Sequence, residues 1–241
     1  ANTTGADNTA VGSQAGDAIT TGASNTLLGK NAGGAITTGN NNIAIGDVAL
    51  DASTTASNNT AVGYSALSAN TTGTANSALG KDALEANTTG DQNVAFGYDA
   101  LTANTTADNN TAIGTEALLV NTTGASNTAV GQGALGANTT ASNNTAVGKA
   151  ALLANTTGAS NTSVGYTSLD ANTTGSNNVA IGQDALGANT TANDNTAIGL
   201  SSLKLNVTGT ANTAVGKDAL RANLADNNTA VGMDALTANT T

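Results

Sequence analysis

The side chains of this chain that could do chemistry are carboxylates, amines and hydroxyls, because the sequence contains no His and no Cys. Without these two residue types there is no histidine-based triad, no thiol nucleophile and no His/Cys zinc site. Ser and Thr are plentiful, but none lies in a nucleophile-elbow pattern with a recognisable base. We therefore expect a protein that is not an enzyme, with no catalytic residue and no cofactor.

Six acidic residues recur at the same place in a 17-residue repeat, and they are the candidates for metal binding: Asp82, Asp99, Glu116, Asp184, Asp218 and Asp234. Other copies of the repeat have Gln, Asn, Val, Gly, Ala, Ser or Thr at that place. Neither the EF-hand pattern nor the calcium β-roll pattern is present. The column is therefore interpreted as a solvated, charged face, and we expect no metal site.

The charge and hydropathy of the chain limit its partners. Six basic residues stand against sixteen acidic ones, which argues against nucleic acid as a partner. No apolar stretch approaches the roughly 20 residues that span a bilayer, so we expect no membrane insertion. The sequence begins and ends inside a repeat, and we expect any targeting or anchoring segment to lie outside it.

The repeat itself predicts the fold. Glycine recurs every 17 residues from Gly12 to Gly216, and Gly232 follows at 16 after a one-residue deletion. We number the repeat from one to seventeen, beginning at its Asn, so that one copy runs from Asn59 to Ala75. A period of 17 suits one solenoid turn with short strands and tight corners. We predict an all-β, parallel β-solenoid (β-roll or β-helix) of about fourteen 17-residue coils, as a single domain over residues 1–241.

Alternation along the strands predicts which side chains are inside. Position four is always aliphatic or aromatic, and position two is Thr, Ser, Val or Ile, so we place both inward and position three outward. Position nine (Leu in most coils) and position eleven (mostly Ala, with Val120 and Leu205) are also predicted to be inward. The predicted interior includes Val62, Ile113, Val147, Leu67, Leu118 and Leu152, and the predicted surface includes Tyr64, Lys81, Lys149 and Tyr166.

Correlated exceptions and invariant residues add detail. Two coils have Gly16 and Gly33 instead of Leu at position nine, and the same coils carry Ile19 and Ile36 at position twelve, so the two positions are expected to share one patch of core. Gly at position five indicates a corner with positive φ or a close approach. Asn at position one, present in every coil, predicts a hydrogen-bonded ladder.

Two columns are candidate binding surfaces. Position three is Ala in twelve of fourteen coils. As an outward strip it predicts self-association with copies of the same chain, through a face that includes Ala95, Ala112, Ala129 and Ala146. Position fourteen is Thr, and it is interpreted either as a structural hydroxyl ladder or as a solvent-facing array that includes Thr89, Thr106, Thr123, Thr140 and Thr157.

The strand motif resembles a known family. Asn42-Ile43-Ala44-Ile45-Gly46, Asn178-Val179-Ala180-Ile181-Gly182 and Asn59-Thr60-Ala61-Val62-Gly63 resemble the Asn-Ser-Val-Ala-Ile-Gly repeat of trimeric autotransporter adhesin heads. The whole unit also looks like repeats of bacterial and phage tail-fibre-like proteins. This resemblance implies a left-handed parallel β-roll, a homotrimer, an extracellular or cell-surface location and a host-surface or matrix receptor. The 17-residue coil is longer than is usual in those heads.

A second resemblance is to ice-binding solenoids, which share the low-charge, Ala/Thr/Asn/Gly-rich composition and often display ranked Thr. Here the Thr residues are adjacent, at positions thirteen and fourteen, rather than in the Thr-x-Thr spacing typical of insect forms, and the spacing of the grass antifreeze repeat also differs. The sequence therefore favours a non-enzymatic structural or adhesive rod of a bacterial surface adhesin or fibre. Ice binding through a regular Thr/Ala face is the alternative, and a purely structural spacer also stays open.

Overall fold

The computed structural model describes residues 2–239 and is an all-β, parallel β-solenoid, as the repeat predicts. Each coil contributes one three-residue strand, and no helix occurs between residues 2 and 239. The strands are β1 (Thr9–Val11), β2 (Thr26–Leu28), β3 (Ile43–Ile45), β4 (Thr60–Val62), β5 (Ser77–Leu79), β6 (Val94–Phe96), β7 (Thr111–Ile113), β8 (Thr128–Val130), β9 (Thr145–Val147), β10 (Thr162–Val164), β11 (Val179–Ile181), β12 (Thr196–Ile198), β13 (Thr213–Val215) and β14 (Thr229–Val231).

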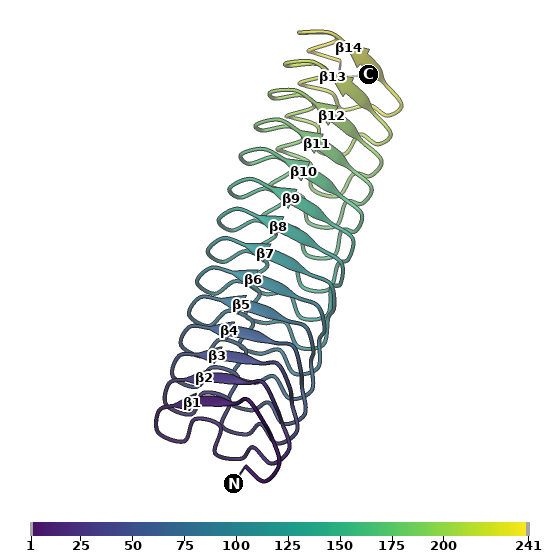
Figure 1. Cartoon of the computed structure of the whole chain (residues 1–241). Coiled ribbons are helices and arrows are strands. Elements are labelled where there is room, and N and C mark those ends of the chain that lie inside the picture. The colour runs from purple at the N-terminus through teal and green to yellow at the C-terminus, as the bar shows by residue number, and fades with distance from the viewer. Residues whose placement is uncertain (1, 240–241) are drawn as a thin grey trace. The chain divides into compact units, whose positions relative to one another are not determined.

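The chain divides into two compact units, Ala1–Thr123 and Gly124–Thr241. The first contains β1 to β7 and the second β8 to β14, and within each unit consecutive strands pair in parallel (Figure 1). Paired Cα atoms are 17 residues apart, as in Ala61↔Ala78, so every position of the repeat forms a column. Between β13 and β14 the offset is 16, because the deletion falls in the loop and leaves Ala214↔Ala230 in register.

The strand faces are opposite to the prediction. The middle residue of each strand from β2 to β14, at position three, is buried, whereas the residues at positions two and four face outward. Val62 and Val147 are half-buried and Ile113 is 38% exposed, so the predicted interior at position four is wrong. The predicted alternation of inward and outward residues is present, but it is displaced by one residue along the strand. A displacement of one residue exchanges the two faces of a strand completely.

The position-nine column supplies most of the core volume. Leu67, Leu118 and Leu152 are fully buried, as predicted. Each large Leu lies in a core that the small Ala side chains at positions three and eight also line, which is why Ala rather than Val fits inside the strand. Position eleven does not join this core: its alanines are half-buried, and Val120 and Leu205 are 38% and 44% exposed. The inward prediction for position eleven is therefore wrong.

The second coil confirms that positions nine and twelve share one patch of core. Ile36 is fully buried, and a Cβ placed on Gly33 would lie 2.8 Å from its Cδ1 atom. The same Cβ would lie 2.7 Å from Cδ2 of Leu27, a position-three residue that is also fully buried. Leu27 and Ile36 thus fill the space that Leu occupies at position nine in other coils.

Two columns of buried Asn link successive coils. At position one, Asn25 Oδ1 accepts hydrogen bonds from the backbone N–H and from Nδ2 of Asn42, both at 3.0 Å, and Asn42 Nδ2 also donates to the carbonyl of Ala56. At position twelve, Asn87 Nδ2 donates to Asn70 Oδ1 at 2.9 Å and to the carbonyl of Gly90 at 3.0 Å. The predicted ladder at position one is confirmed, and a second ladder exists beside it. Both satisfy most of the buried Asn groups, which would otherwise destabilise so thin a core, and the exceptions are Asn189 Oδ1, Asn206 Oδ1 and Asn212 Nδ2.

Glycine at position five is required by both local conformation and space. Gly63 has φ of +138°, and a Cβ on it would lie 2.4 Å from the carbonyl oxygen of Gly80 in the next coil. The predicted corner is therefore confirmed, with both proposed reasons present together.

Candidate binding surfaces

The predicted self-association strip of alanines is not on the surface. Ala95, Ala112, Ala129 and Ala146 are fully buried. Their methyl groups point into the coil, because the strand phase is the reverse of the predicted one. These residues cannot contact a second copy, and the prediction of that face is wrong.

The strand face that does point outward consists of positions two and four. Its position-four side chains include Val11, Leu79 and Phe96, which are 56%, 49% and 40% exposed. No residue at either position, in any coil, carries a charge. In the second unit all of these residues are Thr, Val or Ile, whose branched Cβ atoms restrict the side-chain rotamers. Each unit therefore presents a rigid, largely apolar sheet face.

The two adjacent Thr columns have different environments. At position thirteen the hydroxyl groups bond to the next coil, as Thr71 Oγ1 does to the carbonyl of Thr88 at 3.0 Å and Thr156 Oγ1 to that of Thr173 at 3.0 Å. The position-fourteen residues are exposed in both units: Thr89, Thr106 and Thr123 in the first, and Thr140 and Thr157 in the second. This exposure agrees with the interpretation of the column as a solvent-facing array. Its Thr side chains repeat at roughly the 4.7–4.9 Å spacing of parallel strands.

The acidic column at position seven is partly paired with cations. Asp184 accepts a hydrogen bond from Thr167 Oγ1 at 2.7 Å and forms an ion pair with Lys204 at 2.9 Å. These two hydrogen bonds hold the pKa of the Asp184 carboxyl below its usual value. Asp218 forms an ion pair with Arg221 at 3.3 Å. Between residues 2 and 239 no group of three or more acidic side chains is placed to hold a metal ion.

Two carboxyl groups at position ten, those of Asp51 and Asp170, have pKa values above the usual value for Asp. Burial, and next the charges of Asp17 and Asp47, raise the pKa of Asp51. Burial also raises the pKa of Asp170, against hydrogen bonds from its own and the following backbone N–H groups. Both groups are thus less easily ionised in the folded chain than in an unfolded one.

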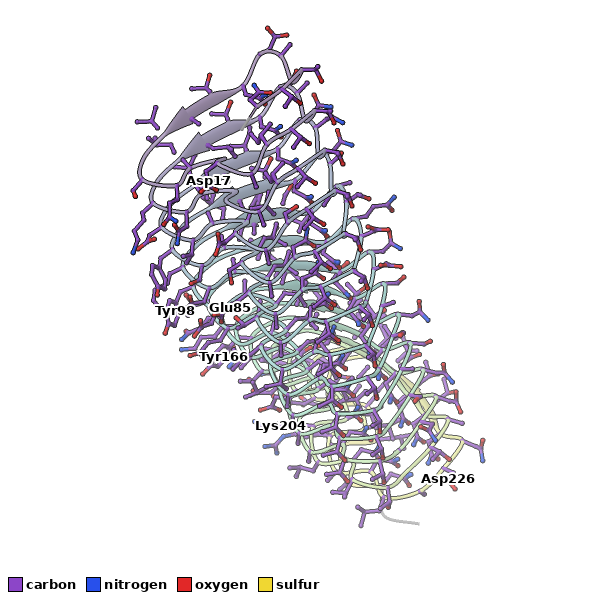
Figure 2. All side chains as sticks on the ribbon, turned by 90° about the horizontal axis from the view of Figure 1, so that it is seen from below. Asp17, Glu85, Tyr98, Tyr166, Lys204 and Asp226 are labelled. Carbon is purple, nitrogen blue, oxygen red and sulfur yellow. The ribbon has the colours of Figure 1, made fainter. Side chains whose placement is uncertain are left out.

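Position six concentrates aromatic and basic residues, which are exposed in both units. It contains all three tyrosines of the chain and four of its six basic residues: Tyr64, Tyr98, Tyr166, Lys30, Lys81, Lys149 and Lys217. All are exposed, which confirms the prediction for Tyr64, Lys81, Lys149 and Tyr166. Figure 2 shows the Tyr98 and Tyr166 side chains projecting from the coils. Sequence reasoning treated these residues singly and missed the column, although the numbers 64, 98 and 166 differ by multiples of 17.

Three consecutive residues of this column are in contact in the first unit. The Lys81 ammonium lies 5.8 Å from the ring centroid of Tyr64 and 5.1 Å from that of Tyr98, and it forms an ion pair with Asp82. That hydrogen-bonded pair raises the pKa of Lys81. A hydrogen bond to Asp99 raises the pKa of the Tyr98 hydroxyl. Lys81 therefore links both rings to Asp82, and Tyr98 has a further hydrogen bond to Asp99.

No family model, curated protein or solved structure matches this chain. In residues 2–239 there is no helix with the length and hydrophobicity needed to cross a membrane.

Proposed function

We propose that this chain is a non-enzymatic structural and adhesive module of an extracellular surface fibre, and that its copies associate through the outward strand face. The observation that carries the proposal is the outward column of aliphatic and aromatic side chains at position four, one on every strand, of which eight are exposed and the rest half-buried. In one unit this column exposes on the order of 400 Å² of apolar surface, comparable with the largest patch on a typical monomeric protein, roughly 300–600 Å².

A second copy of the chain is the occupant that best fits this face. Positions two and four carry no charge, so two copies can bring these faces together without removing ions from water. Every copy also has the same coil spacing, so the side chains of one face can pack between those of the other along a whole unit. Closed symmetric assemblies are the usual result of such self-complementary surfaces. Direct pairing of two such faces gives a dimer, whereas three copies can turn the same face toward a common axis, as in the trimer that the resemblance to adhesin heads implies.

Sedimentation of the wild type and two lysine variants tests this proposal. Ile113→Lys places a charge on the strand face, and Val120→Lys places the same charge at a residue that is equally exposed, 38%, but lies at position eleven. Burying an unpaired ammonium costs several kcal/mol. We expect an oligomeric wild type and Val120→Lys, and at least a tenfold weaker association for Ile113→Lys. A monomeric wild type at high concentration, or equal effects of the two lysines, would contradict the proposal.

Ice binding is a second candidate, favoured by the regular exposure of Thr at position fourteen. A face that uses both Thr and Ala is no longer tenable, because the position-three alanines are buried. Freezing-point hysteresis of the wild type, of Thr106→Tyr and of the control Thr115→Tyr tests the remaining Thr column. Ice binding predicts hysteresis that only Thr106→Tyr abolishes. A wild type without effect on ice growth removes this candidate.

A further inference from the structure

An exposed cluster occupies position six in three consecutive coils of the first unit. It consists of Tyr64, Lys81 and Tyr98. The two rings are 52% and 47% exposed. The two rings are two coils apart, roughly 9–10 Å, and Lys81 approaches both of them from the coil between. Exposed aromatic rings held at a fixed spacing are suited to stacking on a repeating ligand.

We propose that this cluster binds a neutral, extended β-1,4-linked polysaccharide that lies along the position-six column. In such a chain every second sugar presents the same face, and the distance between those sugars is similar to the separation of two coils. Tyr64 and Tyr98 can therefore contact two sugars of the same orientation, with the intervening sugar opposite Lys81. The apolar C–H groups of the sugars would cover the ring surface that Lys81 leaves exposed, which is the main source of binding free energy.

The polar groups around the rings match sugar hydroxyls rather than a charged ligand. The Lys81 ammonium can donate hydrogen bonds, and the carboxylates of Asp82 and Asp99 can accept them. Because Lys81 is already paired with Asp82, and Asp99 adds a further negative charge, the cluster has a formal charge of −1. An acidic polysaccharide would meet that charge directly, so the electrostatics favour a neutral one.

This inference rests on the proposed adhesive function, since it names the class of ligand that the surface would hold. The two proposals fail independently. Self-association through the strand face is measured by sedimentation without any sugar, and polysaccharide binding is measured by titration with oligosaccharides, whatever the oligomeric state.

Isothermal titration with cellohexaose and chitohexaose tests the inference, with maltohexaose and a hyaluronan hexasaccharide as the α-linked and acidic comparisons. We expect binding of at least one neutral β-1,4-linked oligosaccharide and at least tenfold weaker binding of both comparisons. Tyr64→Ala and Tyr98→Ala should each raise the dissociation constant at least tenfold. Because both residues are on the surface, the circular dichroism spectrum and melting temperature should stay close to those of the wild type.

Tyr166→Ala is the matched control. Tyr166 occupies the same repeat position and is exposed to the same extent as Tyr64, 52%, but no second Tyr lies two coils from it. We expect this variant to bind within twofold of the wild type. The inference is overturned if no neutral β-1,4-linked oligosaccharide binds, if maltohexaose or the hyaluronan hexasaccharide binds as tightly, or if Tyr166→Ala weakens binding as much as Tyr64→Ala.

Discussion

Leu67 is the residue at which core burial and unusual backbone conformation can be separated by mutation. Its side chain is fully buried, and its φ is +52°, in the left-handed region that costs a non-glycine residue about 1–2 kcal/mol. Leu67→Ala removes the buried side chain but keeps that conformational cost, so we expect a loss of roughly 2–5 kcal/mol. Leu67→Gly removes the same side chain and one more carbon, and it abolishes the cost.

The two variants should therefore have nearly equal stability. Relief of the left-handed conformation contributes about 1–2 kcal/mol to the Gly variant. Against this, the lost methyl group costs about 0.8 kcal/mol and the greater freedom of the unfolded chain about 0.4–1 kcal/mol. We expect the free energies of unfolding of the two variants to agree within about 1 kcal/mol, although Gly is normally the more destabilising residue.

Urea denaturation followed by circular dichroism measures these free energies. The control is Ala61→Gly, at a fully buried strand residue whose φ is not positive, where the same change from Ala to Gly should cost about 1–2 kcal/mol. A Leu67→Gly variant more than about 1.5 kcal/mol below Leu67→Ala would refute the role assigned to the left-handed backbone. A loss below about 1 kcal/mol for Leu67→Ala would refute the assignment of position nine to the core.

The remaining predictions address the corner, the charges and the correlated core. Gly63→Ala should destabilise by roughly 3 kcal/mol or more, since the added methyl overlaps the next coil. Gly133→Ala, with φ of +65° and only an ordinary contact to Leu153 Cδ1 at 3.6 Å, should lose only about 1–2 kcal/mol; thermal unfolding compares the two variants. The raised pKa of Asp51 adds stability that is fully present below its unfolded pKa of about 3.9 and is lost as the pH rises through the folded value. Asp51→Asn should accordingly raise the urea midpoint at pH 7 and leave it unchanged near pH 3; a pH-independent effect would contradict the shift. In a double-mutant cycle of unfolding free energies, Leu27→Ala and Gly33→Leu should together cost at least about 1 kcal/mol less than the sum of their separate effects, because each fills or vacates the same space. Additive effects would show that the two sites do not share one patch.

The sequence predicted the architecture well because the repeat imposes it. An interval of 17 between glycines such as Gly63 and Gly80 fixes the coil length, and a Gly at +138° fixes the corner. The burial of Leu67 followed from the recurrence of Leu at position nine in twelve of the fourteen coils, since a large aliphatic residue that recurs among Ala, Thr and Asn has few other roles. These predictions depended on recurrence along the chain and did not need the direction of any strand side chain.

The candidate surfaces depended on that direction and were predicted less well. Val62 was placed inside because it is larger and more apolar than Ala61, which is the usual rule. In a coil of only 17 residues, the Leu at position nine already fills much of the interior, so the strand opposite can bring in only a methyl group. For Thr106 the sequence left a structural ladder and a solvent-facing array open, and the structure shows the side chain exposed. The Tyr64 and Tyr98 pair was missed because each residue was judged against its neighbours in sequence rather than against its column.

The exceptions at position three contain the information that fixes the strand phase. Leu27 is the one large residue in that column, and it occurs in a coil that has lost the core Leu, with Gly33 in its place. Ser163 is the one hydroxyl residue there, and its coil also has Ser168 at position eight, where Ala is usual. If position three faced solvent, neither pairing would have a physical reason.

With position three inside, Leu27 restores the core volume that its coil has lost. Ser163 Oγ donates a hydrogen bond to the Ser168 carbonyl at 2.7 Å, which satisfies a polar group that burial would otherwise leave without a partner. In a thin solenoid, exceptions that change together therefore identify the inward residues more reliably than the size or hydropathy of the common residue, because only side chains that share the core are forced to compensate for one another.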